Sequence, residues 1–231
     1  MPPMTLRADI LIIQHAENCP PGRILEYAPH ATTVRMWEDH TALQAMAAGQ
    51  EALPSAIVVL GGTENAYADS AWPWLADVRS ILRRCHEESV PALSVCLGMQ
   101  LAVVAGGGSV AVAAAEGPEV GLTQIFWEED ADDPLTEVTA EWVYADHGDA
   151  VSELPAHAVA LARSDKYVHV MRWGSVVGVQ YHPELTADIL RAWLEKDPPS
   201  NANQLFADYQ NAANDLAEHC QRLCEVVFGV R

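Results

Sequence analysis

Short apolar runs that alternate with helix-like segments are the feature that most restricts the fold of this chain. The run SAIVVLGG is continuous and rich in branched residues, as is typical of a parallel strand covered on both faces. By the same spacing, strands are predicted at 8–14, 32–37, 55–62 and 91–95, and helices at 74–88 and 97–108. This alternation predicts an open α/β sheet.

After residue 109 the spacing of apolar residues changes. The segments 122–129 and 158–164 are shorter, alternate in character and have turn signals between them. We expect them to form added antiparallel strands on the same sheet. The segment 175–184, SVVGVQYHPE, begins again as a buried strand.

The tail of the chain, 186–231, is predicted to be helical. Apolar residues follow a three/four spacing, which makes one face from Leu205, Tyr209, Ala212, Leu216, Cys220, Leu223 and Val227. A single apolar face favours packing on the rest of the chain. We therefore expect a main domain over 1–186 and a C-terminal helical extension over 187–231 that packs on it.

The charge balance argues against two classes of partner. The 231 residues carry a formal net charge of −19, with only 13 lysines and arginines. A negative surface of this size disfavours nucleic acids and anionic membranes. No apolar stretch approaches the roughly 20 residues that span a bilayer. We expect neither nucleic acid nor membrane as a partner.

Cysteine usage and the first apolar run predict a cytoplasmic protein. The five cysteines are scattered, so a disulfide framework is not expected. The run at 10–13 is too short for the core of a secretion signal. Cys220 and Cys224 lie one helical turn apart beside His219, but further ligands at suitable spacing are missing. They fit the apolar face of the tail better, and no metal is expected.

A cysteine stands where a predicted strand ends and a helix begins, in PALSVCLGMQ. A side chain at such a joint projects from the carboxyl edge of the sheet, where open α/β folds bind ligands. The helix amino terminus favours a thiolate at Cys96, and the N–H of Leu97 can stabilise an oxyanion. Gly98 removes a side chain that would crowd the turn. On these residues alone, a buried cysteine acting as a small hydrophobe is an equal alternative.

A histidine and a carboxylate follow in the segment GVQYHPE. Pro183 keeps His182 out of the helical region. Residues two apart in an extended segment point to the same side, so Glu184 can reach the imidazole. Glu184 would then fix the tautomer of His182 while the imidazole exchanges protons. This pattern predicts that Cys96, His182 and Glu184 meet at neighbouring strand ends.

Two further motifs are expected at the same edge. Gly61 and Gly62 end a strand and leave bare backbone where a substrate can approach closely. The N–H of Gly62 is a candidate second oxyanion donor. The polar loop at 145–149, ADHGD, could hold the polar end of a substrate. Its His147 ranks behind His182 as the catalytic histidine, because its i+2 carboxylate lies across an expected turn.

The ordered motifs LGG, PALSVCLGMQLA, DHGDAVSELP and GVQYHPE together resemble the class I glutamine amidotransferases, most of all the glutaminase domain of GMP synthases and its stand-alone relatives. The likeness covers roughly residues 8–186. It implies a flavodoxin-like, mostly parallel sheet with helices on both faces. It also implies a catalytic triad of Cys96, His182 and Glu184, oxyanion donors Gly62 and Leu97, and substrate contacts from Gln100, Asp146, His147, Gly148 and Asp149, with Gly61 beside them.

The sequence departs from the family pattern at two positions. Ser94 stands where the residue two before the nucleophile is usually glycine, and Thr63 replaces the proline of a GGP motif. Neither change removes a reacting group, but both bear on how well the oxyanion hole is formed. No glycine-rich nucleotide loop with a neighbouring lysine is found, so neither activation by ATP nor a cofactor is expected.

Three functions fit these residues. The first is a glutaminase that takes glutamine as substrate and releases ammonia to a separately encoded synthetase. The second keeps the triad but hydrolyses another γ-glutamyl amide or peptide. The third is a non-catalytic relative that binds a ligand or partner, and the intact triad argues against it. The first is preferred; the first two differ in the pocket wall and in whether a partner must be present.

Overall fold

Eight strands form the main sheet of the computed structural model, which describes residues 9–128 and 132–229. They lie in the order β2-β1-β3-β4-β12-β11-β10-β7. The first five are parallel, and β11, β10 and β7 continue the sheet in antiparallel pairs. Their bounds are β1 Ile10–Gln14, β2 Thr32–Arg35, β3 Ala56–Val59, β4 Ala92–Val95, β7 Phe126–Trp127, β10 Val159–Arg163, β11 Val168–Trp173 and β12 Val176–Val179. The predicted open, mostly parallel α/β sheet is confirmed.

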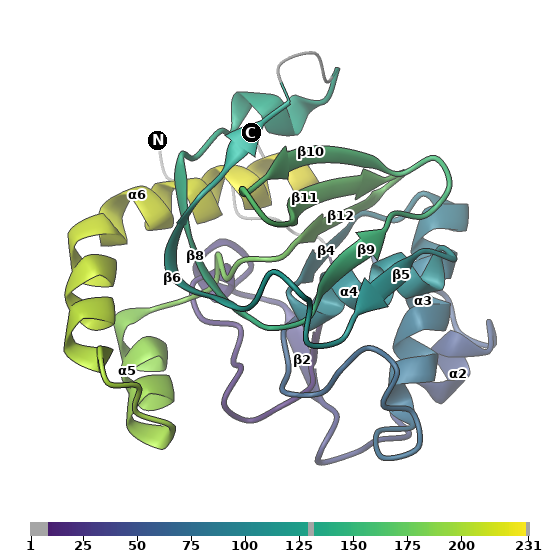
Figure 1. The fold of residues 1–231 in the computed structure, drawn as a ribbon. Coiled ribbons are helices and arrows are strands. Elements are labelled where there is room, and N and C mark those ends of the chain that lie inside the picture. The colour runs from purple at the N-terminus through teal and green to yellow at the C-terminus, as the bar shows by residue number, and fades with distance from the viewer. Residues whose placement is uncertain (1–8, 129–131, 230–231) are drawn as a thin grey trace.

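Helices cover both faces of this sheet (Figure 1). Successive side chains of a strand point to opposite faces, so Leu11 and Ile13 pack with α3 and α4, whereas Ile10 and Ile12 pack with the end of α6. One core cluster therefore lies on each face. The bounds are α1 Ile24–Tyr27, α2 Gln44–Ala47, α3 Trp74–Glu88, α4 Leu97–Ala105, α5 Ala187–Lys196 and α6 Ala202–Phe228, with a 3-10 helix at Pro134–Glu137.

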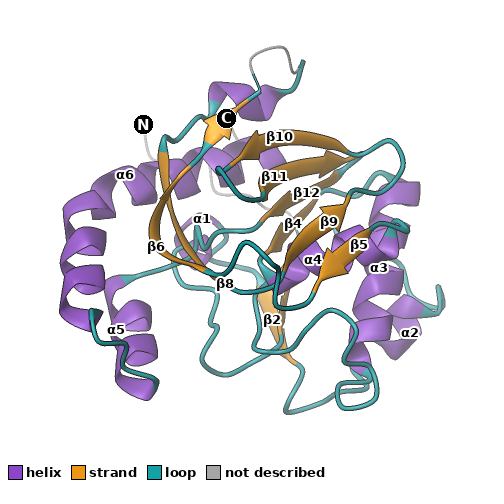
Figure 2. Cartoon of the chain, in the orientation of Figure 1, coloured by secondary structure: helices purple, strands orange, loops and turns teal. Residues whose placement is uncertain are grey.

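Two small two-stranded sheets stand apart from the main sheet (Figure 2). One pairs β5 with β9, and the other, which we call the ribbon, pairs β6 with β8. The expectation of added antiparallel strands in the main sheet is confirmed for 158–164, which forms β10. It is only partly correct for 122–129, because 126–127 form β7 of the main sheet whereas 122–124 belong to β6 of the ribbon. Val120 and Trp142 of the ribbon are 49% and 47% exposed, so the ribbon keeps one face in solvent. The bounds are β5 Ser109–Ala111, β6 Glu119–Gln124, β8 Trp142–His147 and β9 Ala150–Glu153.

The tail forms the predicted helices, α5 and α6. The predicted apolar face of α6 is buried, apart from Ala212, which is partly buried. Cys220, Leu223 and Val227 join the core cluster on one face of the main sheet. The boundary at residue 186 stays a prediction. In residues 9–128 and 132–229 no helix has both the length and the apolar character needed to cross a membrane.

Candidate active site

Three adjacent strands bring the predicted site residues to one edge of the sheet. β4 lies between β3 and β12, and both neighbours run parallel to it. The carboxyl ends of parallel strands meet at the same edge. Gly61 and Gly62 follow β3, Cys96 follows β4 directly, and His182 lies three residues beyond β12, which ends at Val179. Segments that are far apart in the sequence therefore meet around the sulfur of Cys96.

Cys96 occupies the sharp turn between β4 and α4. Its backbone has φ 50° and ψ −107°, a conformation that residues other than glycine rarely adopt. A hydrogen bond from its N–H to the carbonyl of Val179, 2.8 Å long, fixes the turn to β12. Close packing fixes it to β3, because a Cβ on Gly98 would overlap the carbonyl oxygen of Val59. The predicted need for glycine at 98 is confirmed.

His182 and Glu184 form a buried pair. The Nδ1 atom of His182 lies 2.8 Å from Oε1 of Glu184, and the N–H of His182 donates to the carbonyl of Tyr144. Burial by itself would lower the pKa of His182, but the charges of Glu184 and Cys96 raise that pKa well above its usual range. The Trp193 ring lies nearly perpendicular to the imidazole, at an interplanar angle of 77° and with 5.0 Å between ring centroids. The pair can hold a proton close to the thiol.

Most of the predicted residues line one pocket of about 620 Å³. Those in its wall are Gly62, Cys96, Leu97, Gln100, Asp146, His147, Gly148, Asp149 and His182. Leu97 is the first residue of α4, so its N–H has no acceptor within the helix. Gly62 lies against the Leu97 side chain, so the two residues predicted as oxyanion donors are neighbours.

Gly61 and Glu184 are not in the pocket wall. A Cβ on Gly61 would lie 3.1 Å from Cε1 of His182 and 3.5 Å from Cβ of Cys96. Gly61 therefore leaves room for the imidazole and the cysteine, and its contact with a substrate stays a prediction. Glu184 lies behind His182, as a group that orients an imidazole must.

The predicted HGD loop forms the turn that follows β8. The carbonyl of Asp149 accepts hydrogen bonds of 3.0 Å from Nε2 of Gln100 and from Nδ1 of His147. The other ring nitrogen of His147 lies 3.1 Å from Oε2 of Glu119. Both nitrogens of His147 are thus engaged within the protein. His147 is therefore less suited than His182 to exchange protons with a substrate.

Several pocket residues were missed from the sequence. Asn18 and Cys19 follow β1, whose carboxyl end lies beside that of β3. Burial raises the pKa of Cys19 to about 12, so it stays a thiol. Glu64 lies beside Gly62, and within the described residues its Oε2 is buried without a hydrogen-bond partner. The order of the strands is the signal that would have pointed to Asn18 and Cys19.

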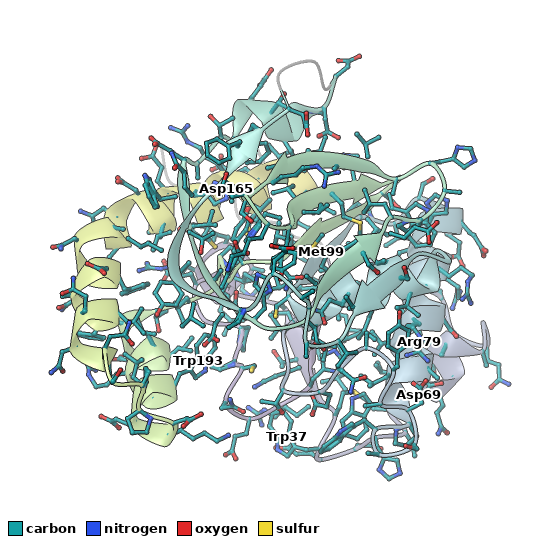
Figure 3. The ribbon with its side chains drawn as sticks, in the orientation of Figure 1. Trp37, Asp69, Arg79, Met99, Asp165 and Trp193 are labelled. Atoms are coloured by element: carbon teal, nitrogen blue, oxygen red, sulfur yellow. The ribbon has the colours of Figure 1, made fainter. Side chains whose placement is uncertain are left out.

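The predicted C-terminal extension also contributes to the pocket. Trp193, Lys196 and Asp197 of α5 and its end line it. Figure 3 shows Trp193 on the inner side of α5, facing the rest of the domain, and its Nε1 donates to the carbonyl of Asn18. The pocket therefore depends on residues on both sides of the predicted boundary.

Glu119, His147 and His169 are spaced closely enough to hold a metal ion. Their ligand atoms lie within 4.8 Å of one another, and all three residues are buried. The spacing of residues along the chain did not predict this cluster. By contrast, Cys220 and Cys224 lie in the core, as their place on the apolar face predicted.

A second pocket of similar size, about 600 Å³, lies between the ribbon and α6. His219 and Arg222 are in its wall, together with several acidic residues, but the wall contains no cysteine. The pocket around Cys96 is therefore the candidate active site.

The chain belongs to the glutamine amidotransferase class-I family, whose model matches residues 24–195. Its relatives include the GMP synthase (glutamine-hydrolyzing) of Thermosynechococcus vestitus, 33% identical over 59% of this chain and 24% of the synthase. The chain thus spans about a quarter of the length of such synthases. Gamma-glutamyl peptidase 5 of Arabidopsis thaliana is 29% identical over 73% of this chain and 70% of the peptidase.

Solved structures support the same fold. A glutamine amidotransferase from Thermotoga maritima aligns with a TM-score of 0.80 at 22% identity, over 96% of this chain and 99% of that one. A glutamine amidotransferase from Methylobacillus flagellatus aligns with a TM-score of 0.74 at 22% identity, over 95% of each chain. At this identity the likeness concerns the flavodoxin-like fold.

Proposed function

We propose that this chain is a glutaminase that hydrolyses the side-chain amide of glutamine and supplies the ammonia to a separately encoded synthetase. The observation that carries the proposal is the strained Cys96 at the strand–helix turn, in one pocket with His182, which Glu184 holds at 2.8 Å. Membership of the amidotransferase family and the GMP synthase relatives support an amide of glutamine as substrate.

The chemistry proposed for this pocket has two halves. The Cys96 thiolate attacks the amide carbon, and the N–H groups of Gly62 and Leu97 hold the resulting oxyanion. Collapse of this intermediate breaks the C–N bond, the protonated His182 gives its proton to the leaving ammonia, and a γ-glutamyl thioester remains on Cys96. His182 then takes a proton from water, which attacks the thioester carbon. Glutamate leaves, and Cys96 and His182 return to their starting states.

The first test is an assay of the purified chain for ammonia and glutamate released from L-glutamine. We expect turnover by the wild-type chain and a loss of at least ~10³-fold in Cys96→Ser, because the covalent route needs the thiolate. Glu184→Ala should reduce kcat strongly, since His182 then loses its orienting partner. Turnover that survives intact in Cys96→Ser would disprove the assignment.

A second candidate function is hydrolysis of a γ-glutamyl peptide with the same residues. It is favoured by the coverage of the relatives, because the chain spans 70% of the gamma-glutamyl peptidase but only 24% of the GMP synthase. A γ-glutamyl dipeptide in the same assay decides between them. Release of the free amino acid from the dipeptide, with no ammonia from glutamine, would favour the peptidase function. Ammonia from glutamine with an untouched dipeptide would favour the glutaminase.

A further inference from the structure

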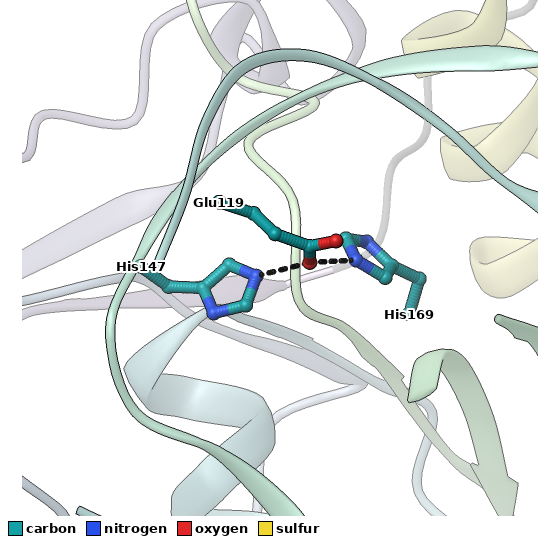
Figure 4. Close-up of side chains that lie close together, drawn as sticks. All are labelled: Glu119, His147 and His169. Carbon is teal, nitrogen blue, oxygen red and sulfur yellow. Dashed lines mark hydrogen bonds and ion pairs between the residues drawn. The ribbon is translucent and has the colours of Figure 1, made fainter. Parts of the chain in front are cut away.

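Glu119 joins three segments of the protein at one carboxylate oxygen. It lies opposite His147 in the ribbon, where the two are paired in the strand register. Its Oε2 atom is 3.1 Å from Nε2 of His147 and 2.8 Å from Nε2 of His169, which belongs to β11 of the main sheet. Figure 4 shows the carboxylate between the two rings, with both interactions meeting at one oxygen. The ribbon is therefore tied to the main sheet at this point.

The partners of each ring define its hydrogens. Both nitrogens of His147 face oxygen acceptors, the carboxylate of Glu119 and the carbonyl of Asp149, so each nitrogen carries a hydrogen. His169 donates from Nε2, and within the described residues its Nδ1 has no partner, which identifies the neutral Nε2–H tautomer.

Burial and hydrogen bonding shift the pKa values of His169 and Glu119. Burial lowers the pKa of His169, in keeping with a neutral ring. Burial alone would raise the pKa of Glu119, but the hydrogen bonds from the two rings bring it below its usual range. Both directions agree with a Glu119 carboxylate that accepts hydrogen bonds from the two rings.

His147 connects Glu119 to the pocket wall. Its Nδ1–H shares the carbonyl of Asp149 with the side chain of Gln100, which lies one helical turn after Cys96. The turn at 147–149 is therefore fixed on one side to the nucleophile's helix and on the other, through Glu119, to β11. The distance between this turn and the sulfur of Cys96 depends on both attachments.

We propose that Glu119 is a positioning residue for the substrate pocket, which holds the 147–149 turn in place by accepting hydrogen bonds from both His147 and His169. This inference rests on the proposed function, because the turn forms the wall in which the polar end of glutamine would bind. Glu119 itself lies outside the pocket wall, so it acts through His147. Loss of its charge should weaken substrate binding more than it slows the chemical steps.

A metal ion is the other occupant that two histidines and a glutamate could take. The direct contacts of 2.8 and 3.1 Å from one oxygen to both rings are ordinary hydrogen-bond distances, and a bound ion would replace these contacts. We therefore favour the hydrogen-bonded arrangement and make metal binding an outcome of the test.

The first experiment reads the rings without any substitution. Nitrogen-15 nuclear magnetic resonance of histidine-labelled protein distinguishes a doubly protonated ring from each neutral tautomer. We expect two protonated nitrogens for His147 and a single Nε2–H for His169. In Glu119→Gln the His147 ring should lose one of its hydrogens. A ring of His147 or His169 whose Nε2 carries no hydrogen in the wild-type chain would overturn the proposal.

The second experiment separates binding from chemistry. In Glu119→Gln we expect KM for L-glutamine to rise by about tenfold, the size of one charge-assisted hydrogen bond, while kcat changes by less than about threefold. Glu116→Gln is the matched control, because Glu116 is exposed and lies only three residues away. It should leave both constants unchanged.

Three results would contradict the proposal. One is an unchanged KM in a folded Glu119→Gln protein. Another is a loss of kcat as large as the tenfold change expected for KM. The third is one equivalent of zinc or another metal in the purified wild-type chain that disappears in Glu119→Gln. If the wild-type chain does not turn over glutamine, the proposed function fails, and the resonance experiment still decides the state of the two rings.

Discussion

Cys96 combines a backbone conformation that is costly for a side chain with the position that the chemistry needs. The motifs around it, CLG and HPE, could be predicted from the sequence because each acts over a few neighbouring residues. Glu119 and His169 could not, because they stand 28 and 22 residues from His147 and meet it only in the folded chain. Local spacing contains no information about such meetings.

The charge on Glu184 has a consequence for stability that depends on pH. The raised pKa of His182 means that the pair stabilises the fold below the usual histidine value of about 6.5. This stabilisation is lost as the pH rises through the raised value. We expect Glu184→Gln to lower the free energy of unfolding by about 3 kcal/mol near pH ~6 and by much less near pH ~10, measured by urea denaturation.

Both proteins in that comparison should carry Cys96→Ser, so that the thiolate no longer contributes to the pKa of His182. Glu195→Gln, an exposed position on α5, serves as the control and should show no such dependence. An equal loss of stability at the two pH values would mean that the Glu184 charge does not hold the proton on His182.

Among the elements, β4 was predicted well because its apolar run is short, continuous and bounded by a proline and the cysteine. The ribbon was predicted less well. Alternating residues indicate a strand, but they do not specify its partner, so β6 was expected in the main sheet and instead pairs with β8. The chain crosses from the ribbon to the main sheet at Ile125, and the alternation of apolar and polar residues does not predict this crossing.

Ser94, in the middle of β4, is a departure from the family pattern that the structure locates in the core. Within the described residues its hydroxyl is fully buried and lacks a hydrogen-bond partner. We expect Ser94→Ala to raise the free energy of unfolding by about 1 kcal/mol, because an unsatisfied polar group is removed at little cost in packing. Urea denaturation measures the change.

Ser175 is the matched comparison for Ser94. Its hydroxyl donates a 2.7 Å hydrogen bond to the carbonyl of Cys85. Ser175→Ala should therefore lower the free energy of unfolding by about 1 kcal/mol, opposite in sign to Ser94→Ala. Destabilisation by both substitutions would show that the Ser94 hydroxyl makes a favourable interaction after all.

At the scale of the whole molecule, the tail is the part whose role the sequence described incompletely. The prediction of an apolar face on α6 was correct, because the spacing of its residues is a local feature of the sequence. The sequence did not indicate that α6 completes one face of the main sheet, or that α5 brings Trp193 against His182. These contacts join residues that are distant in the chain. The apolar periodicity of a helix predicts only that its apolar face packs against some other part of the protein.

Truncation of Leu223 tests whether α6 and the sheet unfold together. Leu223 is 1% exposed in the core cluster beneath the sheet. We expect Leu223→Ala to lower the free energy of unfolding by about 2–4 kcal/mol while thermal unfolding keeps a single transition. Asn214→Ala, on the exposed side of the same helix, should change stability by less than about 0.5 kcal/mol. A separate early transition of α6 would instead favour an independent extension.

The placement of β4 between β3 and β12 has a consequence for how such a protein can diversify. The three strands that end at the sulfur, the imidazole and the paired glycines are contiguous and central, whereas the ribbon and both tail helices are attached around them. Insertions or replacements in those outer parts can reshape what reaches the sulfur without moving the sulfur itself. New substrates are therefore accessible to this architecture through its periphery alone.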